Sequence, residues 1–444
     1  MARQPEEKLS RPVGLFSLTA VAINGIVGAG ILVLPATVAK LLGAASPLAY
    51  LIAWFAVTLI GLCFAEMGSI YESSGGPYVH AQAAFGSFVA FEVAWFFLLA
   101  RLTAVAAISN GFTTYLGQFW PQLAAGPGRV LAITLLIVIL AAVNFAGVRY
   151  GAWVINLLTI GKLVPLLIFI AVGLFWLDPG SYSFTLPASG LALRSASLVL
   201  IFALGGFEYA SVPSEEVTNP RRDTPISMMA AITICACLYI LIQMIALSTV
   251  PGLADSPRPL ASAAARFLGP AGATLLALGA ILSTGGTNSA IMLVGPRLLY
   301  AMARDGQLPR VLARVHPRYC TPHIAIICFT VLAWAAALYG NFAQLAALSA
   351  IARLPYFITT SLAVPVLRHK LPQLATQRKF RIPGGALIPV LATLVCIWLL
   401  TGSSRGQAVL GLAALASGAL IYLIGKLFID RRNRAESPSS ERSF

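Results

Sequence analysis

The sequence predicts an all-α integral membrane protein with about twelve transmembrane helices. The chain is 58% hydrophobic and only 10% of its residues are charged, whereas a soluble domain carries about 25% charged residues. Apolar stretches long enough to cross a bilayer recur along its length, and in lipid such a stretch must be helical because no water bonds its peptide groups. The run at residues 130–145 is continuous and does not alternate, which argues against a transmembrane β-barrel.

Polar loops that contain glycine and proline separate the expected spans. The spans fall near residues 15–43, 47–70, 86–117, 128–146, 150–176, 193–211, 225–250, 268–303, 323–340, 344–367, 384–402 and 406–429. Residues 1–14 are expected to form a cytoplasmic N-terminal tail. Residues 430–444 are polar and rich in serine and arginine, and we expect a disordered cytoplasmic tail there.

Lys and Arg residues are concentrated in the loops and tails on one side of the predicted membrane. If the N-terminus is cytoplasmic, 21 of the 30 Lys and Arg residues fall in inner loops and tails, 6 fall on the outer side and three lie within spans. This bias predicts a multi-pass protein of the plasma (cytoplasmic) membrane with both termini inside. It also argues against a nucleic-acid partner, although the net charge is +15.

Two spans contain glycines near their middles. The first holds Gly25, Gly28 and Gly30, and the sixth holds Gly205 and Gly206. Because a glycine inside a helix costs about 1 kcal/mol relative to alanine, these clusters predict helices that are locally unwound. Small residues that allow close helix packing are the alternative interpretation.

The two breaks lie five spans apart, so the broken helices run in opposite directions. This spacing is typical of a five-plus-five inverted repeat whose broken helices meet at the middle of the membrane. Residues 15–176 are therefore expected to form a first repeat of five helices and residues 193–367 a second. Residues 384–429 would contribute two additional C-terminal helices.

The first break can bind both ends of a zwitterion. A half-helix that begins near Gly28 directs the N–H groups of Ala29 and Gly30 and its positive dipole end at a carboxylate. The preceding half-helix leaves carbonyls free for an ammonium group. The sixth span adds carbonyls near Phe202 and Gly205, and Phe202 is a candidate aromatic gate or, alternatively, an ordinary core residue.

Two charged residues lie deep within spans. Glu208 follows the second break, and a carboxylate inside a membrane usually faces a cavity or a partner, for which Arg101 or Arg353 could serve. Lys162 lies about 18 Å along the fifth span, near the middle of the bilayer. Such a lysine must find carbonyls or an acid, or lose its proton. It is either a titrating group beside the first break or a permanently charged link between helices.

The eighth span carries small polar residues, and a hydroxyl such as that of Ser283 or Thr284 could help to hold Lys162. Helix packing is the common alternative for such residues. The four histidines and the scattered acids show neither metal-ligand spacing nor a hydrolytic triad. We therefore expect no metal, no cofactor and no enzyme active site.

At these residues the chain resembles the amino acid–polyamine–organocation (APC) superfamily of permeases. The resemblance extends over nearly the whole length, and its motifs occur in order along the chain. They comprise Gly28, Ala29, Gly30 and Ile31 with Pro35; Ser74, Gly75, Gly76, Pro77 and Tyr78 before Phe85 and Gly86; Gly206, Phe207 and Glu208; Glu215, Glu216 and Val217; Asn219, Pro220, Arg221, Arg222 and Pro225; and Arg297, Ala303, Arg304, Asp305, Gly306 and Pro309.

The resemblance implies alternating access, with the backbone of the first and sixth spans holding the substrate. The candidate substrate-binding residues are Ile26, Val27, Gly28, Ala29, Gly30, Phe202, Ala203, Gly205, Phe207 and Glu208. Lys162 resembles a lysine that replaces a sodium ion in some members, and the candidate ion-coupling residues are Lys162, Gly25, Ser283 and Thr284. Many members have serine where this chain has Ala29, so only backbone donors remain there.

The leading hypothesis is a secondary active transporter for an amino acid or a related amine, coupled to protons through Lys162. An ion-independent exchanger or exporter is the runner-up, and a sensor that binds without transport is a third possibility. The expected partners are the small-molecule substrate, the proton and the lipid bilayer. The protein is expected to be a monomer or a weak homo-oligomer.

Overall fold

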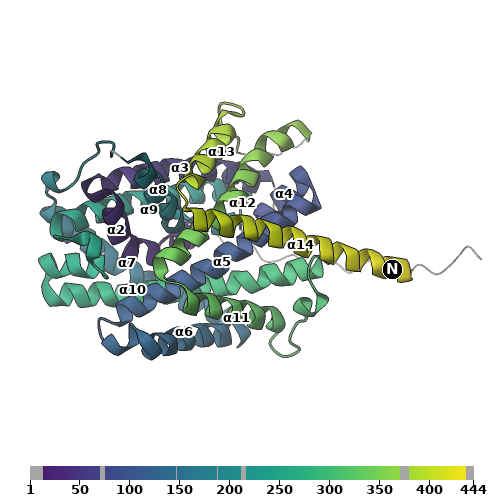
Figure 1. Ribbon diagram of the computed structural model, residues 1–444, viewed down its shortest axis with the longest axis horizontal. Coiled ribbons are helices and arrows are strands. Elements are labelled where there is room, and N and C mark those ends of the chain that lie inside the picture. The colour runs from purple at the N-terminus through teal and green to yellow at the C-terminus, as the bar shows by residue number, and fades with distance from the viewer. Residues whose placement is uncertain are drawn as a thin grey trace, which may run out of the picture.

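The structure is a computed structural model that describes residues 14–70, 76–146, 148–187, 189–211, 217–370 and 380–436. These residues form a bundle of helices without any strand, so the all-α prediction is confirmed (Figure 1). Within them, eight helical stretches are long and apolar enough to cross a membrane, and three shorter apolar helices accompany them. The exact count of twelve spans stays a prediction. Most of the two predicted tails, at residues 1–13 and 437–444, lies outside the described ranges.

The first half of the chain begins with a helix in two pieces. The first predicted span is divided into α1 (Leu15–Ile26) and α2 (Ala29–Leu42), with residues 27 and 28 between them. The helices that follow are α3 (Ser46–Ile70), α4 (Pro77–Phe85), α5 (Ser87–Leu116), α6 (Gly126–Ala146) and α7 (Val148–Gly173).

The second half begins in the same way. The sixth predicted span is divided into α8 (Gly190–Leu204) and a short 3-10 turn, η5 (Phe207–Ser211), with Gly205 and Gly206 between them. The helices that follow are α9 (Pro220–Thr249), α10 (Pro259–Arg304), α11 (His323–Tyr339), α12 (Phe342–Lys370), α13 (Leu387–Leu400) and α14 (Arg405–Glu436).

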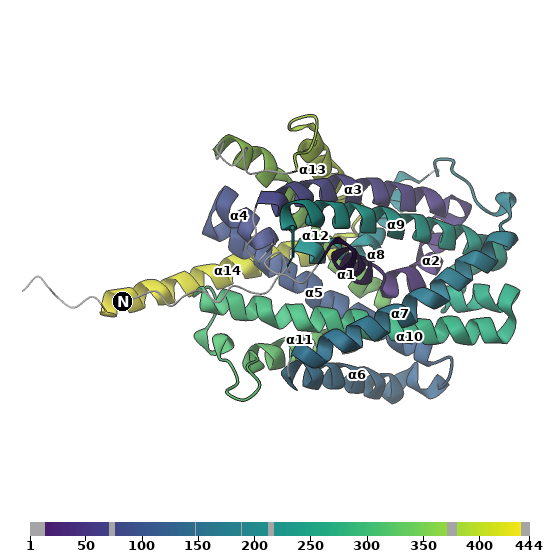
Figure 2. The ribbon, with the colours of Figure 1, turned by 180° about the vertical axis from the view of Figure 1, so that it is seen from behind.

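The helices of the two halves pack against each other. α3 packs on α9, α5 on α12 and α7 on α10, while α1 lies inside the bundle against α9 and η5. In Figure 2, α1 is seen near the middle of the bundle, next to α9. α13 packs against α12, α3 and α8, and α14 packs against α5 and α12. α14 lies at the edge of the bundle and extends past it (Figure 1), and it exposes leucines such as Leu410 and Leu412, as a helix in contact with lipid would.

A buried ion pair joins the ends of α3 and α12. Glu66 is fully buried, and its carboxylate accepts hydrogen bonds from Arg368 Nε at 2.7 Å and Arg368 Nη2 at 2.5 Å. The backbone N–H of Ile382 donates to the same carboxylate at 2.9 Å. Ser69 on α3 donates to the carbonyl of Phe380 at 3.2 Å. The chain segment before α13 is thereby attached to both helices.

Candidate substrate site

The first break exposes peptide groups in the interior of the bundle. α1 ends at Ile26, and Val27 and Gly28 have extended backbone, with φ/ψ of −72°/95° and −135°/−150°. The N–H groups of Ala29 and Gly30 open α2, and the first N–H groups of a helix have no partner within it. They lie at the positive end of the helix dipole. This arrangement can bind a carboxylate.

The second break lies directly against the first. Gly205 is extended, and Gly206 has φ 117°, a conformation that is comfortable only for glycine. A Cβ on Gly25 would lie 2.8 Å from the carbonyl oxygen of Gly206, and one on Gly206 would collide with the backbone of Gly25. The phenol of Tyr239 donates to the carbonyl of Ile26 at 2.9 Å. Glycine at both breaks therefore allows the two unwound segments to touch.

A small cavity lies between the breaks. Its volume is about 20 Å³, which is room for about one water molecule, so an amino acid can enter only if the surrounding helices move apart. Six predicted binding residues line it, namely Ile26, Gly28, Ala29, Gly30, Phe202 and Gly205. The other lining residues are Gly25, Ala104, Ile108, Tyr209, Thr287, Ile291 and Arg353.

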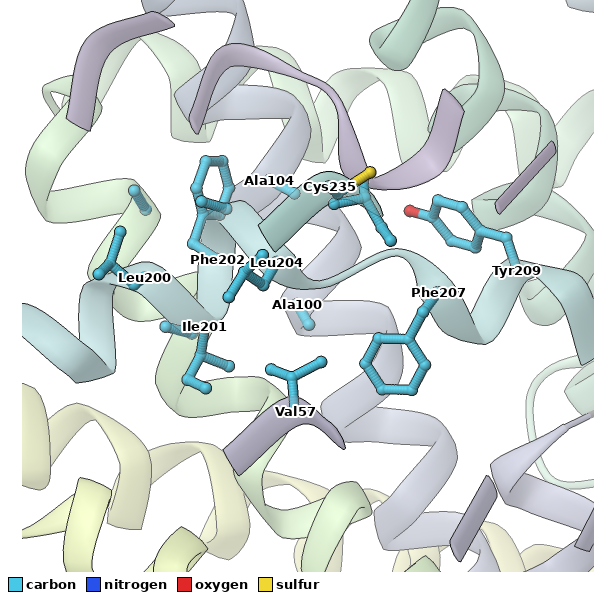
Figure 3. Packing of buried hydrophobic residues seen from close by; sticks show 14 of the residues in the cluster. Val57, Ala100, Ala104, Leu200, Ile201, Phe202, Leu204, Phe207, Tyr209 and Cys235 are labelled. Atoms are coloured by element: carbon cyan, nitrogen blue, oxygen red, sulfur yellow. The ribbon is translucent and has the colours of Figure 1, made fainter. Parts of the chain in front are cut away.

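The remaining four candidates are close in sequence but do not line the cavity. The carbonyls of Val27 and Ala203 accept hydrogen bonds from other helices. Phe207 packs edge-on against Phe64 with 5.7 Å between ring centroids. Figure 3 shows the reason, since Phe202 and Phe207 project to opposite sides of the unwound segment. Glu208 belongs to a buried ion cluster next to the cavity.

Phe202 separates this cavity from a larger one. Its ring meets that of Phe342 edge-on, with centroids 5.9 Å apart. Phe342 also lines an open cavity of about 520 Å³ at the junction of α5, α6 and α12, together with polar residues such as Asn110 and Arg129. The larger cavity lacks the unwound backbone that could hold a zwitterion, so the smaller one is the better candidate site. The aromatic pair is the layer between them.

Lys162 binds the end of α1. The residue is 1% exposed, and its ammonium nitrogen donates to the carbonyls of Asn24 at 2.9 Å and Val27 at 2.7 Å. Ser283 Oγ also reaches the Val27 carbonyl, at 3.5 Å. α7 and α10 thus both hold the first break.

The other two candidates for ion coupling lie elsewhere. The hydroxyl of Thr284 donates within its own helix to the carbonyl of Ala280. Gly25 lines the central cavity. Neither residue has a hydrogen bond to the Lys162 ammonium among the contacts of the described chain.

Glu208 is paired with both buried arginines. Its Oε1 accepts from Arg101 Nη2 at 3.2 Å, Arg353 Nη1 at 3.1 Å and Tyr356 Oη at 3.2 Å. Its Oε2 accepts from the backbone N–H of Gly206 at 2.8 Å. The carboxylate therefore also fixes the geometry of the second break.

Several residues of the site had no clear signal in the sequence. Thr287 is one of several small polar residues of the eighth span, and Tyr239 lies in the mostly apolar seventh span. The sequence does not reveal which helix face either residue occupies. Arg353 was considered only as a partner of Glu208, yet it also lines the cavity. Glu66 and Glu92 also lie within predicted spans, so a count of the charges there does not assign Arg353 to the cavity.

The whole chain was compared with known proteins. A family model described as amino acid permease matches residues 13–424. The chain belongs to the amino acid permease family. This agrees with the resemblance to the APC superfamily found in the sequence. Its multiple apolar helices and its family make it a multi-pass membrane permease rather than an enzyme.

Individual relatives are named for different substrates. The permease is 31% identical over 447 residues to the branched-chain amino acid permease BcaP of Bacillus subtilis (strain 168), with 95% of this chain and 94% of the relative covered. It is 28% identical over 439 residues to the methylthioribose transporter of the same organism, with 95% of each covered. It is 29% identical over 410 residues to the human b(0,+)-type amino acid transporter 1, with 88% of this chain and 82% of the relative covered.

Proposed function

We propose that this permease is a secondary active transporter that moves an amino acid or a related amine across the plasma membrane by alternating access. The observation that carries the proposal is the contact between two unwound segments around one cavity. The start of α2 offers N–H groups to a carboxylate, and the ends of α1 and α8 offer carbonyls to an ammonium group. The names of the relatives support transport of an amino acid or a related small molecule.

The helix pairing supports an inverted repeat of residues 15–176 and 193–367. In such a repeat the third span corresponds to the eighth and the fifth to the tenth. The pair α5–α12 would then be equivalent to the pair α10–α7, and both pairs are closely packed. The pair α1–α9 would likewise be equivalent to α8–α3, and both of these also pack together. Movement of one repeat relative to the other would open the cavity to each side in turn.

We further propose that Lys162 couples transport to protons. An ammonium group in lipid is held only by strong acceptors, and here two carbonyls at the end of α1 hold it. Loss of its proton would remove the positive charge that strengthens both hydrogen bonds and would weaken the attachment of the first break to α7. Protonation would therefore change the stability of the closed arrangement, which is the requirement for coupling a proton to a conformational cycle.

The test is transport by the purified full-length chain in proteoliposomes. The unaltered protein is expected to accumulate its amino acid when a pH gradient is imposed. Lys162→Ala should lose accumulation driven by the gradient, whereas Lys40→Ala, at an exposed position of α2, should retain it. Full proton-driven accumulation by Lys162→Ala would show that the coupling role is wrong. Equal counterflow with and without a gradient in the unaltered protein would identify an ion-independent exchanger instead.

A further inference from the structure

The buried charges beside the cavity do not balance. Arg101 and Arg353 are 0% and 3% exposed, and Glu208, their shared partner, is 1% exposed. Two guanidinium groups and one carboxylate leave an excess of one positive charge, because the tyrosines of the cluster are neutral. An unbalanced charge away from water is costly. The excess favours a negatively charged group that enters from outside the protein.

The two arginines differ in their surroundings and in their access to the cavity. Arg101 lies 4.1 Å from the ring centre of Phe97 and 4.3 Å from that of Tyr209, and it donates to the phenol of Tyr209 as well as to Glu208. These aromatic faces stabilise a cation. The Nε of Arg101, like that of Arg353, has no hydrogen-bond partner in the described part of the chain, but Arg101 does not line the cavity, so a ligand there would not meet it.

Arg353, in contrast, lies at the cavity itself, where its guanidinium can donate further hydrogen bonds. It lines the cavity with Gly205 and Tyr209. Its Nη1 must share Oε1 of Glu208 with two other donors. Its Nε is buried and has no hydrogen-bond partner in the described part of the chain. A Cβ on Gly205 would collide with this guanidinium, so the glycine allows it to reach the unwound backbone.

Arg129, the cation of the larger cavity, is satisfied in a different way. Its Nε donates to the side-chain oxygen of Asn110 at 2.9 Å, and its Nη2 donates to the carbonyls of Ala337 at 3.1 Å and Gly340 at 3.0 Å. Those carbonyls lie at the C-terminal end of α11, where a cation is favourable. Arg129 is therefore satisfied within the protein and is not a second candidate for binding an anion.

The central cavity thus contains two features that attract anions. One is the start of α2, with the N–H groups of Ala29 and Gly30, and the other is the guanidinium of Arg353. An amino acid with a neutral or cationic side chain has only one carboxylate. It would therefore leave one of these two anion-binding features without a partner. We propose that the substrate is an amino acid with an acidic side chain, whose second carboxylate is bound by Arg353. The inference rests on the proposed function, since it specifies the substrate class of the same site.

The first experiment compares substrates that differ in one charge. Counterflow of glutamate and aspartate is measured in proteoliposomes at pH 7, where their side chains are ionised, beside glutamine, asparagine, leucine and arginine. We expect one of the two acids to be transported at least about tenfold faster than its amide, as for a site with a buried charged donor. If leucine or arginine is transported and neither acid is, the proposed substrate class is wrong, but the transporter function still holds. Absence of flux for every amino acid would contradict the transporter function itself.

The second experiment tests Arg353 directly. Arg353→Gln should reduce counterflow of the acid at least about tenfold relative to that of its amide, and Arg353→Lys should keep part of the preference because it keeps the charge. Arg405→Gln, at an exposed position at the start of α14, removes one arginine elsewhere and should leave the preference unchanged. An equal loss for acid and amide in Arg353→Gln would show that the arginine only supports the fold or binds the α-carboxylate. If Arg353→Gln does not fold, the ratio of acid to amide in Arg353→Lys decides.

Discussion

At the scale of single residues, the closest approaches in the site depend on glycine. Gly25 and Gly206 allow the two breaks to touch, and Gly30 allows the start of α2 to lie against α8. A Cβ on Gly30 would lie 2.7 Å from both the Cα and the Cβ of Ala203. Because one of these atoms is backbone, a side-chain rotation cannot relieve the overlap. The helices would have to separate at the point where the carboxylate is expected to bind.

Gly30→Ala should therefore lower the apparent affinity for substrate by at least about tenfold, since overpacking in a well-packed interior costs about 1–3 kcal/mol. The measurement is the KM of uptake in proteoliposomes, with ligand-induced thermal stabilisation as a second readout. Gly285→Ala is the matched control, because it lies in α10 and its Cβ would have no neighbour within 4 Å. Unchanged affinity in Gly30→Ala would mean that the substrate binds elsewhere.

The sequence identified residues whose chemistry is conspicuous but not the direction in which side chains point. The glycine clusters and Lys162 were predicted because glycine and charge are costly inside a membrane helix. The position of Phe207 outside the cavity could not be predicted, because the φ of 117° at Gly206 turns the chain just before it. Arg101 or Arg353 was predicted as a possible partner for Glu208, and both pair with it.

At the scale of elements, the ends of α3 and α12 form a rigid junction. The pair Glu66–Arg368 is doubly hydrogen-bonded, and the backbone of Ile382 bonds to both members. Glu66 is fully buried, and the Arg368 side chain is 11% exposed. The arrangement connects the last helices of the chain to a helix of the first half. The junction fixes where α13 begins.

Glu66→Gln should destabilise the protein by about 3–5 kcal/mol, because removal of one partner leaves the other charge buried and unpaired. The measurement is the unfolding transition of the purified protein in detergent. The double variant Glu66→Gln with Arg368→Gln provides the control, since it removes both charges and should recover part of the loss. If the free energy of unfolding of the double variant falls by the sum of the losses in Glu66→Gln and Arg368→Gln alone, the two side chains contribute no coupling energy.

Element boundaries were predicted where the apolar pattern changes abruptly and missed where it does not. The nine residues of α4, from Pro77 to Phe85, are too short and too polar to register as a span. A proline at its start and Gly86, with φ 88°, at its end define the helix. α10 contains a kink at Gly269, whose φ of 65° and ψ of −164° are not helical, so a short helix from Pro259 precedes a longer one that begins close to the predicted boundary at residue 268.

At the scale of the whole molecule, the fold class follows from composition, but the packing of the bundle does not. A chain with 10% charged residues has too few of them to cover the surface of a soluble globule. Its long apolar stretches therefore predict membrane-spanning helices. Which helices touch depends on small surfaces such as those at Ala100 and Ala104, which are fully or almost fully buried. These alanines do not differ in the sequence from alanines that face lipid.

The orientation of the molecule is a prediction of charge alone and can be tested by thiol labelling. Cys320 is an exposed cysteine in the loop between α10 and α11, on the side where Lys and Arg are concentrated. The loop before α8 is expected on the opposite side, and Leu186 in it is 79% exposed. A membrane-impermeant maleimide added to intact cells should therefore label Leu186→Cys and leave Cys320 unlabelled, because positively charged loops stay in the cytoplasm.

Cys320 should react only after the membrane is permeabilised. The Leu186→Cys variant is made in a Cys320→Ser background, so that each sample has one reactive thiol in a loop. Cys237 is also exposed, but it lies in the middle of α9, within a predicted span that a water-soluble maleimide does not reach. Labelling of Cys320 in intact cells would show that the predicted orientation is reversed.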